Sequence, residues 1–377
     1  MSTTDVAVIG AGAAGSSAAF HLARLGHRVT VLERDRSERV KPCGGGMAAS
    51  VQQWFPFDLQ PAVDNVIQQV DFSWCLTDPV VAELPGSAPF WIVKRERLDA
   101  LLLEQAIALG AELRQPFEVD DLQQQDKSHW LVRSKDGEVI EAKAVVLADG
   151  SGSPWPTRLG IGPRSLHMAK TLSVRLEGMG SLQPGTARFE FGLVHHGFAW
   201  AFPVQNGINV GVGTFIGRRA SDAEAVLEQL LPDLGFSSTD GLRQNADLRV
   251  WNGHTPLHGK GIVAVGDAAS LCDPFLAEGL RPSLMSGCEA AASLDSWLKG
   301  TQPDLSNYTV RMRECWGDSM AWGRRIAQVF YRFPKVGYQL GIKRPTAPQR
   351  IAQILSGEMG YGDIAQRVIR RLMLQRG

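Results

Sequence analysis

The feature that most constrains this sequence is a glycine-rich turn near the N-terminus, between a short apolar run and a helix-favouring segment. Residues 5–9 (DVAVI) are typical of a buried parallel strand, and Gly10, Gly12 and Gly15 follow in GxGxxG spacing. The first glycine permits a tight turn, the second lets the backbone approach a pyrophosphate, and the third lets helix and strand pack closely. The pattern predicts a βαβ unit that binds a dinucleotide.

The segments after this turn support the same interpretation. Residues 13–25 favour a helix, and residues 28–32 (RVTVL) form the next predicted strand. Ala13 and Ala14 open that helix, where free N–H groups and partial positive charge suit a phosphate. Glu33 ends the second strand 18 residues after the last glycine, where its carboxylate can accept hydrogen bonds from ribose hydroxyls. A carboxylate there would repel a 2′-phosphate, which disfavours NADP at this site.

Two later strand ends distinguish FAD from NAD. Residues 144–148 (AVVLA) run into Asp149-Gly150, and a further apolar strand ends at Gly266-Asp267. An NAD dehydrogenase has no need of a late strand followed by Gly-Asp-Ala. A longer cofactor does, because Asp267 can accept a hydrogen bond from a ribityl chain. We therefore expect FAD in the dinucleotide site.

A change of pattern in the middle of the chain predicts a second domain. Residues 171–215 read as short alternating strands, with Asn206-Gly207 as a hairpin turn between the last two. For a chain of 377 residues we expect two structural units or one large unit with an insertion. The predicted parts are an FAD-binding domain at 1–55, 90–160 and 255–300, a substrate-binding sheet domain at 56–89 and 161–254, and a helical C-terminal region at 301–377.

The glycine turn together with the late strand end resembles the FAD-dependent oxidoreductases of the glutathione-reductase-like and aromatic-hydroxylase-like superfamily. This resemblance implies an α/β fold: a Rossmann-like FAD-binding domain of the three-layer ββα type, an inserted antiparallel-sheet substrate domain and a helical C-terminal region. In that pattern Arg95 lies near the cofactor. We place Arg34 and Val119 among the cofactor-binding residues as well.

The loop Lys41-Pro-Cys-Gly-Gly-Gly-Met47 resembles the KPCGGG motif of geranylgeranyl reductases, which saturate isoprenoid double bonds in chlorophyll and archaeal lipid synthesis. Successive glycines have no side chains to block a planar ring, so Gly44 and Gly45 are predicted to lie against the flavin and Gly46 near substrate. Cys43 is the candidate catalytic residue, in contact with flavin or substrate. A small buried hydrophobe is an equally good interpretation of this cysteine.

A second segment resembles the substrate motif of the same family. Phe198, Trp200 and Phe202 alternate along a predicted strand and therefore share one face, and Gly211 and Gly213 follow on the paired strand. A row of aromatic side chains could wall a tunnel for an apolar chain, and the glycines would leave it room. The alternative is that the aromatic side chains simply form sheet core.

The run from Asp267 to Leu280 resembles the GDAAG…P…GEGI run of the family. The resemblance places Pro274, Gly279 and Leu280 over the flavin. Ser270 and Ala277 occupy positions that are usually glycine, which indicates a divergent member.

The resemblance implies a reductase that saturates C=C bonds of a prenyl, geranylgeranyl-type chain with hydride from reduced FAD. The proton donor stays open between a carboxylate near the flavin, water and Cys43, and the electron donor between NADPH and reduced ferredoxin. The alternative is an FAD-dependent monooxygenase or halogenase on the same scaffold, although halogenases need a catalytic lysine that is not evident in a matching context. A third interpretation is a flavin-bearing prenyl-lipid or pigment carrier without turnover.

Charge and cysteine content narrow the remaining classes. Lys+Arg and Asp+Glu both number 39, which argues against nucleic-acid binding through bulk positive potential. Residues 301–377, however, have 13 Lys/Arg against 5 Asp/Glu, interleaved with aromatic residues, as suits an anionic bilayer surface or a redox-protein donor. Five cysteines without a CxxC pair indicate neither a metal site nor a disulfide framework. We expect a cytoplasmic protein with a peripheral membrane contact.

Overall fold

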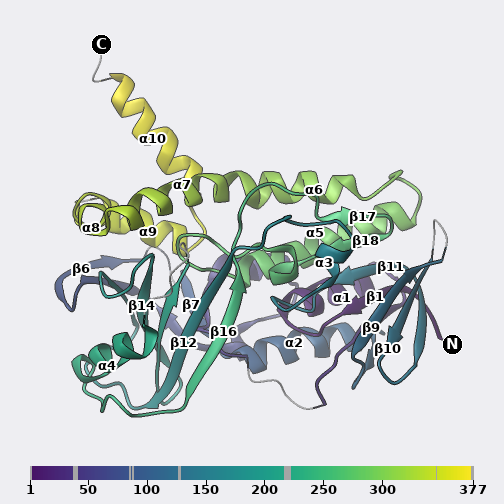
Figure 1. The fold of residues 1–377 in the computed structure, drawn as a ribbon, viewed down its shortest axis with the longest axis horizontal. Helices are drawn as coiled ribbons and strands as arrows, with labels where there is room; N and C mark the ends of the chain where they lie inside the picture. The colour runs from purple at the N-terminus through teal and green to yellow at the C-terminus, as the bar shows by residue number, and fades with distance from the viewer. Residues whose placement is uncertain are drawn as a thin grey trace.

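The structure, a computed structural model, describes residues 2–36, 41–84, 86, 89–125, 129–215, 222–344 and 346–374, with side chains up to residue 367. Within these residues the chain forms three sheets and a set of C-terminal helices (Figure 1). The strands that carry the predicted dinucleotide turn lie in one half of the molecule, and the sheet that carries the predicted substrate motif lies in the other (Figure 1).

The first sheet has the order β17-β18-β11-β1-β2-β8, with the N-terminal strand near its centre. Its strands are β1 (Ser2–Ile9), β2 (Val29–Leu32), β8 (Glu112–Arg114), β11 (Val139–Leu147), β17 (His258–Gly259) and β18 (Ile262–Ala264). β1 pairs in parallel with β2 and β11, as a βαβ unit requires. β9 (Val119–Gln124) and β10 (Trp130–Ser134) extend the sheet through antiparallel pairing of β10 with the first part of β11.

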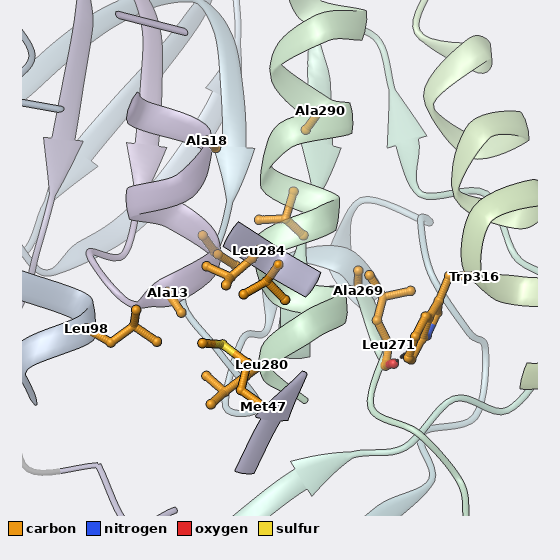
Figure 2. Close-up of a cluster of buried hydrophobic side chains, with 14 of the residues drawn as sticks. Ala13, Ala18, Met47, Leu98, Ala269, Leu271, Leu280, Leu284, Ala290 and Trp316 are labelled. Atoms are coloured by element: carbon orange, nitrogen blue, oxygen red, sulfur yellow. Dashed lines mark hydrogen bonds between the residues drawn. The ribbon is translucent and has the colours of Figure 1, made fainter. Parts of the chain in front are cut away.

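Three helices pack together beside this sheet: α1 (Ala13–Arg24), α2 (Arg95–Ala108) and α5 (Leu280–Leu298). α1 contacts both of the other helices as well as β1 and β2. α1 and α5 approach so closely that a Cβ added at Gly287 would lie 2.7 Å from Ala14 O. The Ser17 hydroxyl donates to Leu284 O at 2.9 Å across the same contact. Figure 2 shows the small residues Ala18 and Ala290 where these helices meet. α1 is thereby held against α5 as well as against the sheet.

The second sheet has seven strands in the order β16-β12-β15-β14-β13-β5-β6. They are β5 (Gln69–Trp74), β6 (Thr77–Glu83), β12 (Met168–Glu177), β13 (Thr186–Phe191), β14 (Gly197–Val204), β15 (Gly207–Thr214) and β16 (Arg243–Arg249). The predicted hairpin at Asn206-Gly207 is confirmed, since Val204 pairs with Gly207 and Asn206 has φ 65°. The sheet is not wholly antiparallel, because β13 pairs in parallel with β5, which arrives from the earlier part of the chain.

Smaller elements complete the two halves. A three-stranded sheet consists of β3 (Gly46–Ala48), β7 (Phe90–Val93) and β4 (Val63–Ile67), and it contacts β14. α4 (Ala223–Asp233) packs on the second sheet through buried leucines such as Leu227 and Leu230. The short helical segments are α3 (Trp155–Arg158) and 3₁₀ turns at Ala49–Trp54, Gln60–Ala62 and Gly266–Ala269.

The C-terminal helices form a separate group along one side of the molecule (Figure 1). They are α6 (Ser306–Met312), α7 (Asp318–Arg332), α8 (Pro334–Gly341), α9 (Ala347–Leu355) and α10 (Tyr361–Leu374), with a π-turn at Arg313–Gly317. Buried aromatic side chains connect this group to the half of the molecule that contains the first sheet. Tyr308 donates to Ala264 O at 2.8 Å, and Trp316 donates to Leu271 O at 2.8 Å. Figure 2 shows Trp316 beside Leu271.

The predicted fold class is confirmed: a Rossmann-like sheet, an inserted second sheet and a helical C-terminal region are all present. The predicted domain boundaries stay a prediction. No helix in the described ranges combines the length and the apolar character needed to cross a bilayer.

The α1–α5 contact gives a direct test of the packing. A Gly287→Ala substitution should lower the free energy of unfolding by about 1–3 kcal/mol, because the new methyl group would overlap the backbone of α1. Gly341→Ala is the matched control, since its Cβ meets its nearest neighbour, Phe330, at an ordinary 3.8 Å. Thermal unfolding of both variants measures the difference, and equal melting temperatures would contradict the packing argument.

Candidate active site

The glycine turn is shaped by contacts that leave no room for side chains. Gly10 has φ 102°, and a Cβ there would lie 2.5 Å from Ala148 O. A Cβ at Gly15 would lie 1.9 Å from Gly10 O, so Gly15 packs the helix on the turn. Gly12 is the N-cap of α1 and makes no side-chain cap, which leaves the first N–H groups of the helix available to a phosphate.

A polar cavity opens on one side of this turn. Glu33 lines it and is 7% exposed; its Oε2 accepts from Ala11 N–H at 2.8 Å and its Oε1 from Asp35 N–H at 3.1 Å. The predicted residues that line this cavity are Gly10, Glu33, Arg34, Val119 and Asp149. Two aromatic residues that the sequence did not single out, Phe117 and Trp155, also line it. The cavity has the carboxylate and aromatic surface that an adenosine requires.

Two buried polar residues, Asp149 at this cavity and Arg249 at the end of β16, interact through their charges. Burial raises the pKa of Asp149, and within the described residues its Oδ1 has no hydrogen-bond partner. Arg249 is 3% exposed and donates to Ser153 O and, at 3.5 Å, to Ala268 O. A buried carboxylate oxygen without a partner is costly unless a ligand supplies a donor. Arg249 lies far from any nucleotide motif in sequence, so no pattern pointed to it.

The main cavity lies on the other side of the turn. The predicted residues that line it are Gly12, Ala13, Ala14, Cys43, Gly44, Gly45, Gly46, Arg95, Gly150, Phe198, Trp200, Phe202, Asp267, Gly279 and Leu280. They come from both halves of the molecule, so the glycine loop and the aromatic row meet there with part of the predicted cofactor-binding set.

The glycine loop forms one wall of the main cavity. Gly45 has φ 78°, and a Cβ there would lie 2.5 Å from Val93 O. A Cβ at Gly46 would lie 2.7 Å from the Phe90 ring, and one at Gly44 would lie 3.2 Å from Trp200 Nε1. These glycines therefore serve close packing against β7 and the aromatic side chains, besides offering a flat surface to a ring.

Cys43 is half-buried in this loop. Its Sγ accepts from Gly45 N–H at 3.3 Å, and its carbonyl oxygen accepts from Asn209 Nδ2 at 3.4 Å. Asn209 in turn accepts from Trp200 Nε1 at 3.0 Å. This chain of hydrogen bonds couples the loop to the second sheet. Asn209 was missed; its signal was a lone amide inside the otherwise apolar strand INVGVG.

Aromatic side chains form the opposite wall. Phe189, Phe198, Trp200, Phe202 and Phe215 all line the cavity and are buried. Phe189 pairs directly with Trp200 across β13 and β14 and completes the wall with no motif of its own. The predicted row is therefore larger than the sequence motif.

Gly211 and Gly213 line neither of these two cavities. A Cβ at Gly211 would lie 2.1 Å from the Trp200 ring, and one at Gly213 would lie 2.3 Å from the Phe215 ring. The space that these glycines leave is filled by aromatic side chains of the protein, so they support the wall from behind.

The loop before α5 carries the carboxyl groups of the site. Asp273 is fully buried; its Oδ1 accepts from Phe275 N–H at 2.6 Å and Leu276 N–H at 3.0 Å, and its Oδ2 from Tyr361 Oη at 2.7 Å. Glu278 lines the main cavity and lies 2.7 Å from Arg281 Nη2. Burial raises the pKa of Glu278 to about 7, and its Oε1 has no partner in the described part of the chain.

Pro274, Asp267 and Arg95 are three further predicted cofactor residues. Pro274 lines neither cavity. Asp267 lines the main cavity, 3.3 Å from Lys41 Nζ, and is the second residue of the 3₁₀ turn Gly266–Ala269. Arg95 also lines the main cavity; it is the first residue of α2 and is held by Asp99 at 2.9 Å.

The residues present fit FAD. The polar cavity offers a carboxylate and aromatic surface at one end, the uncapped start of α1 and Gly12 lie in the middle, and the main cavity offers a glycine-faced wall at the other. The buried, unpartnered oxygen of Asp149 lies beside this path. The arrangement is that of a dinucleotide site with one end at an apolar, aromatic cavity.

Comparison with known proteins agrees with this geometry. Residues 5–51 match the family model described as FAD dependent oxidoreductase. The chain is 30% identical over 358 residues to menaquinone reductase of Mycobacterium tuberculosis, covering 88% of this chain and 85% of that protein. It is 29% identical over 344 residues to digeranylgeranylglycerophospholipid reductase 2 of Methanothermobacter thermautotrophicus, covering 84% and 85%.

The fold likewise matches a crystal structure. A geranylgeranyl bacteriochlorophyll reductase-like protein of Thermoplasma acidophilum superposes with a TM-score of 0.78 at 19% identity, covering 94% of this chain and 92% of that chain. The protein is thus an FAD-dependent oxidoreductase. Within that class, the chain belongs to the same family as the menaquinone reductase, to which it is 30% identical.

The two departures from the family's glycine pattern have a structural cost. Ser270 has φ 56° and Ala277 has φ 57°, a left-handed conformation that costs a residue with a Cβ about 1–2 kcal/mol. Ala277→Gly should therefore raise the free energy of unfolding by about 0.5–1 kcal/mol, after the larger backbone entropy of glycine is deducted. Ala292→Gly in the exposed part of α5 is the control and should lower it by about 1 kcal/mol. Denaturant titration of both would contradict this expectation if the two changes had the same sign.

Proposed function

We propose that this protein saturates C=C double bonds in the prenyl, geranylgeranyl-type chain of a lipid, diphosphate or pigment. The observation that carries the proposal is a single buried cavity in which the Gly44–Gly46 loop faces Phe198, Trp200 and Phe202. Such a cavity accepts an apolar chain and excludes water from it. The likeness to a digeranylgeranylglycerophospholipid reductase and to a menaquinone reductase supports the assignment.

FAD, when bound and reduced, supplies the hydride for one alkene carbon. The protein's own residues hold the alkene against the ring and provide a proton for the other carbon. The aromatic wall orients the chain, and the carboxyl groups of Glu33 and Asp267 bind the polar parts of the cofactor. Orientation in a dry cavity is the main contribution that a protein makes to such a transfer.

Glu278 is the proton donor that the geometry favours. It lines the same cavity as Cys43 and the aromatic wall, and its neighbour Gly279 caps the helix that begins at Leu280. With the pKa raised to about 7 by burial, its carboxyl group is protonated over much of the neutral range. Arg281 holds Oε2 at 2.7 Å and leaves Oε1 without a partner among the described residues.

Replacing this carboxyl group tests the role. Glu278→Gln should lower the rate of double-bond reduction by about 10²–10⁴-fold, because the amide cannot deliver a proton to carbon. The wild-type rate should fall above pH 7 as the carboxyl group ionises, and this limb should vanish in the variant. Rates measured in single turnovers from pH 5 to 9 check both, and an unchanged pH profile would exclude Glu278.

The same substitution has a predicted effect on stability. Since the pKa of Glu278 is raised in the folded state, its contribution to stability is complete at low pH and is lost as pH rises toward about 7. Glu278→Gln should flatten that part of the profile of unfolding free energy against pH.

Cys43→Ser tests the alternative proton donor, because the serine hydroxyl is close in size to the cysteine thiol. Loss of turnover in this variant, with turnover retained in Glu278→Gln, would favour Cys43.

The reaction itself is tested by product mass. Chemically reduced protein incubated with geranylgeranyl diphosphate, and separately with a geranylgeranyl glycerophospholipid, should yield products heavier by one H₂ per double bond. Parallel reactions with NADPH and with reduced ferredoxin identify the electron donor. No mass gain with any prenyl substrate would overturn the proposed function, and tight lipid binding without turnover would favour a carrier.

The monooxygenase or halogenase alternative has its own signature. Lys41 is a lysine that lines the main cavity, but it is engaged with Asp267 at 3.3 Å. Oxygen consumption coupled to hydroxylation or halogenation of an aromatic substrate would favour the alternative. Reduction of the alkene under anaerobic conditions would favour the reductase.

A further inference from the structure

An exposed apolar stripe marks the junction of α7 and α8. Val329, Phe333, Val336 and Leu340 are 68%, 58%, 55% and 54% exposed, and all four fall within a single short stretch of chain. Isolated exposed apolar residues are ordinary, but a contiguous group on one helix face is a recognised mark of an interaction site.

The local hydrogen bonds place these residues on one side. Gly337 N–H donates to Phe333 O at 2.8 Å, and Phe333 is the N-cap of α8. Val336 and Leu340 have i, i+4 spacing and share a face of that helix, and Phe333 precedes them at its N-terminal end. Val329 adjoins them, since Phe333 N–H donates to its carbonyl oxygen at 3.3 Å. We call these four residues the apolar stripe.

The opposite side of the same helices is buried in the protein. Tyr338 donates to Phe72 O at 3.0 Å, and a Cβ at Gly337 would lie 2.7 Å from the Phe330 ring. Phe330 contacts Phe191 at a ring distance of 5.4 Å, and Phe191 contacts Phe198 of the cavity wall at 5.9 Å. The apolar stripe therefore lies on the outer surface of the helices that cover the cavity's aromatic side.

The charged residues of the segment that carries the stripe are basic. Residues 319–357 contain seven Lys/Arg and no Asp/Glu. Arg325, Arg332, Lys335 and Arg344 are exposed, and Arg332 lies 5.8 Å over the Phe333 ring. Lys343 is engaged with Asp78 at 2.6 Å and contributes less free charge.

We infer that the α7–α8 face, with the apolar stripe at its centre and these cations around it, docks on the surface of an anionic lipid bilayer. Apolar side chains enter the boundary between head groups and acyl chains, and each nearby cation adds electrostatic attraction to an anionic surface. An acidic redox protein would account for the cations but would leave four apolar side chains without a reason for their exposure. This inference does not depend on which reaction the cavity performs.

Vesicle binding of the full-length FAD-loaded protein tests the inference. The probes are vesicles of phosphatidylcholine alone and of phosphatidylcholine with about one quarter phosphatidylglycerol. We expect co-sedimentation with the anionic vesicles and little with the neutral ones. Phe333→Asp/Leu340→Asp should weaken binding at least tenfold, and Arg332→Gln/Lys335→Gln should weaken it and reduce its salt dependence.

The matched control is Leu25→Asp/Leu109→Asp, which places the same charges at apolar residues that are 42% and 46% exposed on α1 and α2 ends. It should bind vesicles like the wild type. Melting temperature and flavin absorbance verify that every variant is folded. Equal losses in control and stripe variants, wild-type binding by the stripe variants, or salt-sensitive binding of an acidic ferredoxin without vesicle binding would each overturn the inference.

Reduction of a short, detergent-dispersed prenyl substrate should be unchanged in the stripe variants, which separates this test from that of the proposed function.

Discussion

The structure depends on the close packing of α1 against the first sheet and against α5. Gly15 brings the helix onto the turn at Gly10 O, and Gly287 brings α5 onto Ala14 O, so backbone meets backbone on both sides. A helix fixed this way has one position for its N-terminus, which is where the phosphates of a dinucleotide must lie. The same contact fixes α5, whose first residue, Leu280, lines the main cavity. Both ends of the cofactor site are thus set by one packing contact.

Sequence patterns located what is local and missed what is brought together by the fold. The turn from Gly10 to Gly15 could be predicted because its glycine spacing between a strand and a helix is a recurrent motif. Gly15 packs on Gly10 O within the motif, and Gly10 packs on Ala148 at the end of a neighbouring strand. Asn209 and Arg249 could not, because their roles arise from partners at Cys43 and Ser153, which are distant in the chain. The glycines at Gly211 and Gly213 indicate free space beside the strand, but the pattern does not say that the Trp200 and Phe215 rings fill that space.

The loop from Asp273 to Arg281 shows why the C-terminal helices belong to the site. A fully buried carboxylate persists only with several donors, and Asp273 takes one of its three from Tyr361, at the start of α10. Trp316 supports the same region, with Arg281 5.0 Å over its ring. The helical region therefore helps to position the loop that carries Glu278. A substitution in these helices would alter the position of that carboxyl group in the cavity.

The charges of the chain are unevenly distributed between its C-terminal region and the rest. Equal numbers of acidic and basic residues cancel in total, while residues 301–377 have a net charge of +8 and the remainder −8. A protein with separated charge aligns in the field of an anionic surface, basic side first, although its net charge gives no attraction. The cations that produce this alignment surround the apolar stripe, and the helices that bear the stripe cover the aromatic wall. Alignment would therefore bring the cavity's covering helices to the lipid, where the substrate proposed above would be concentrated.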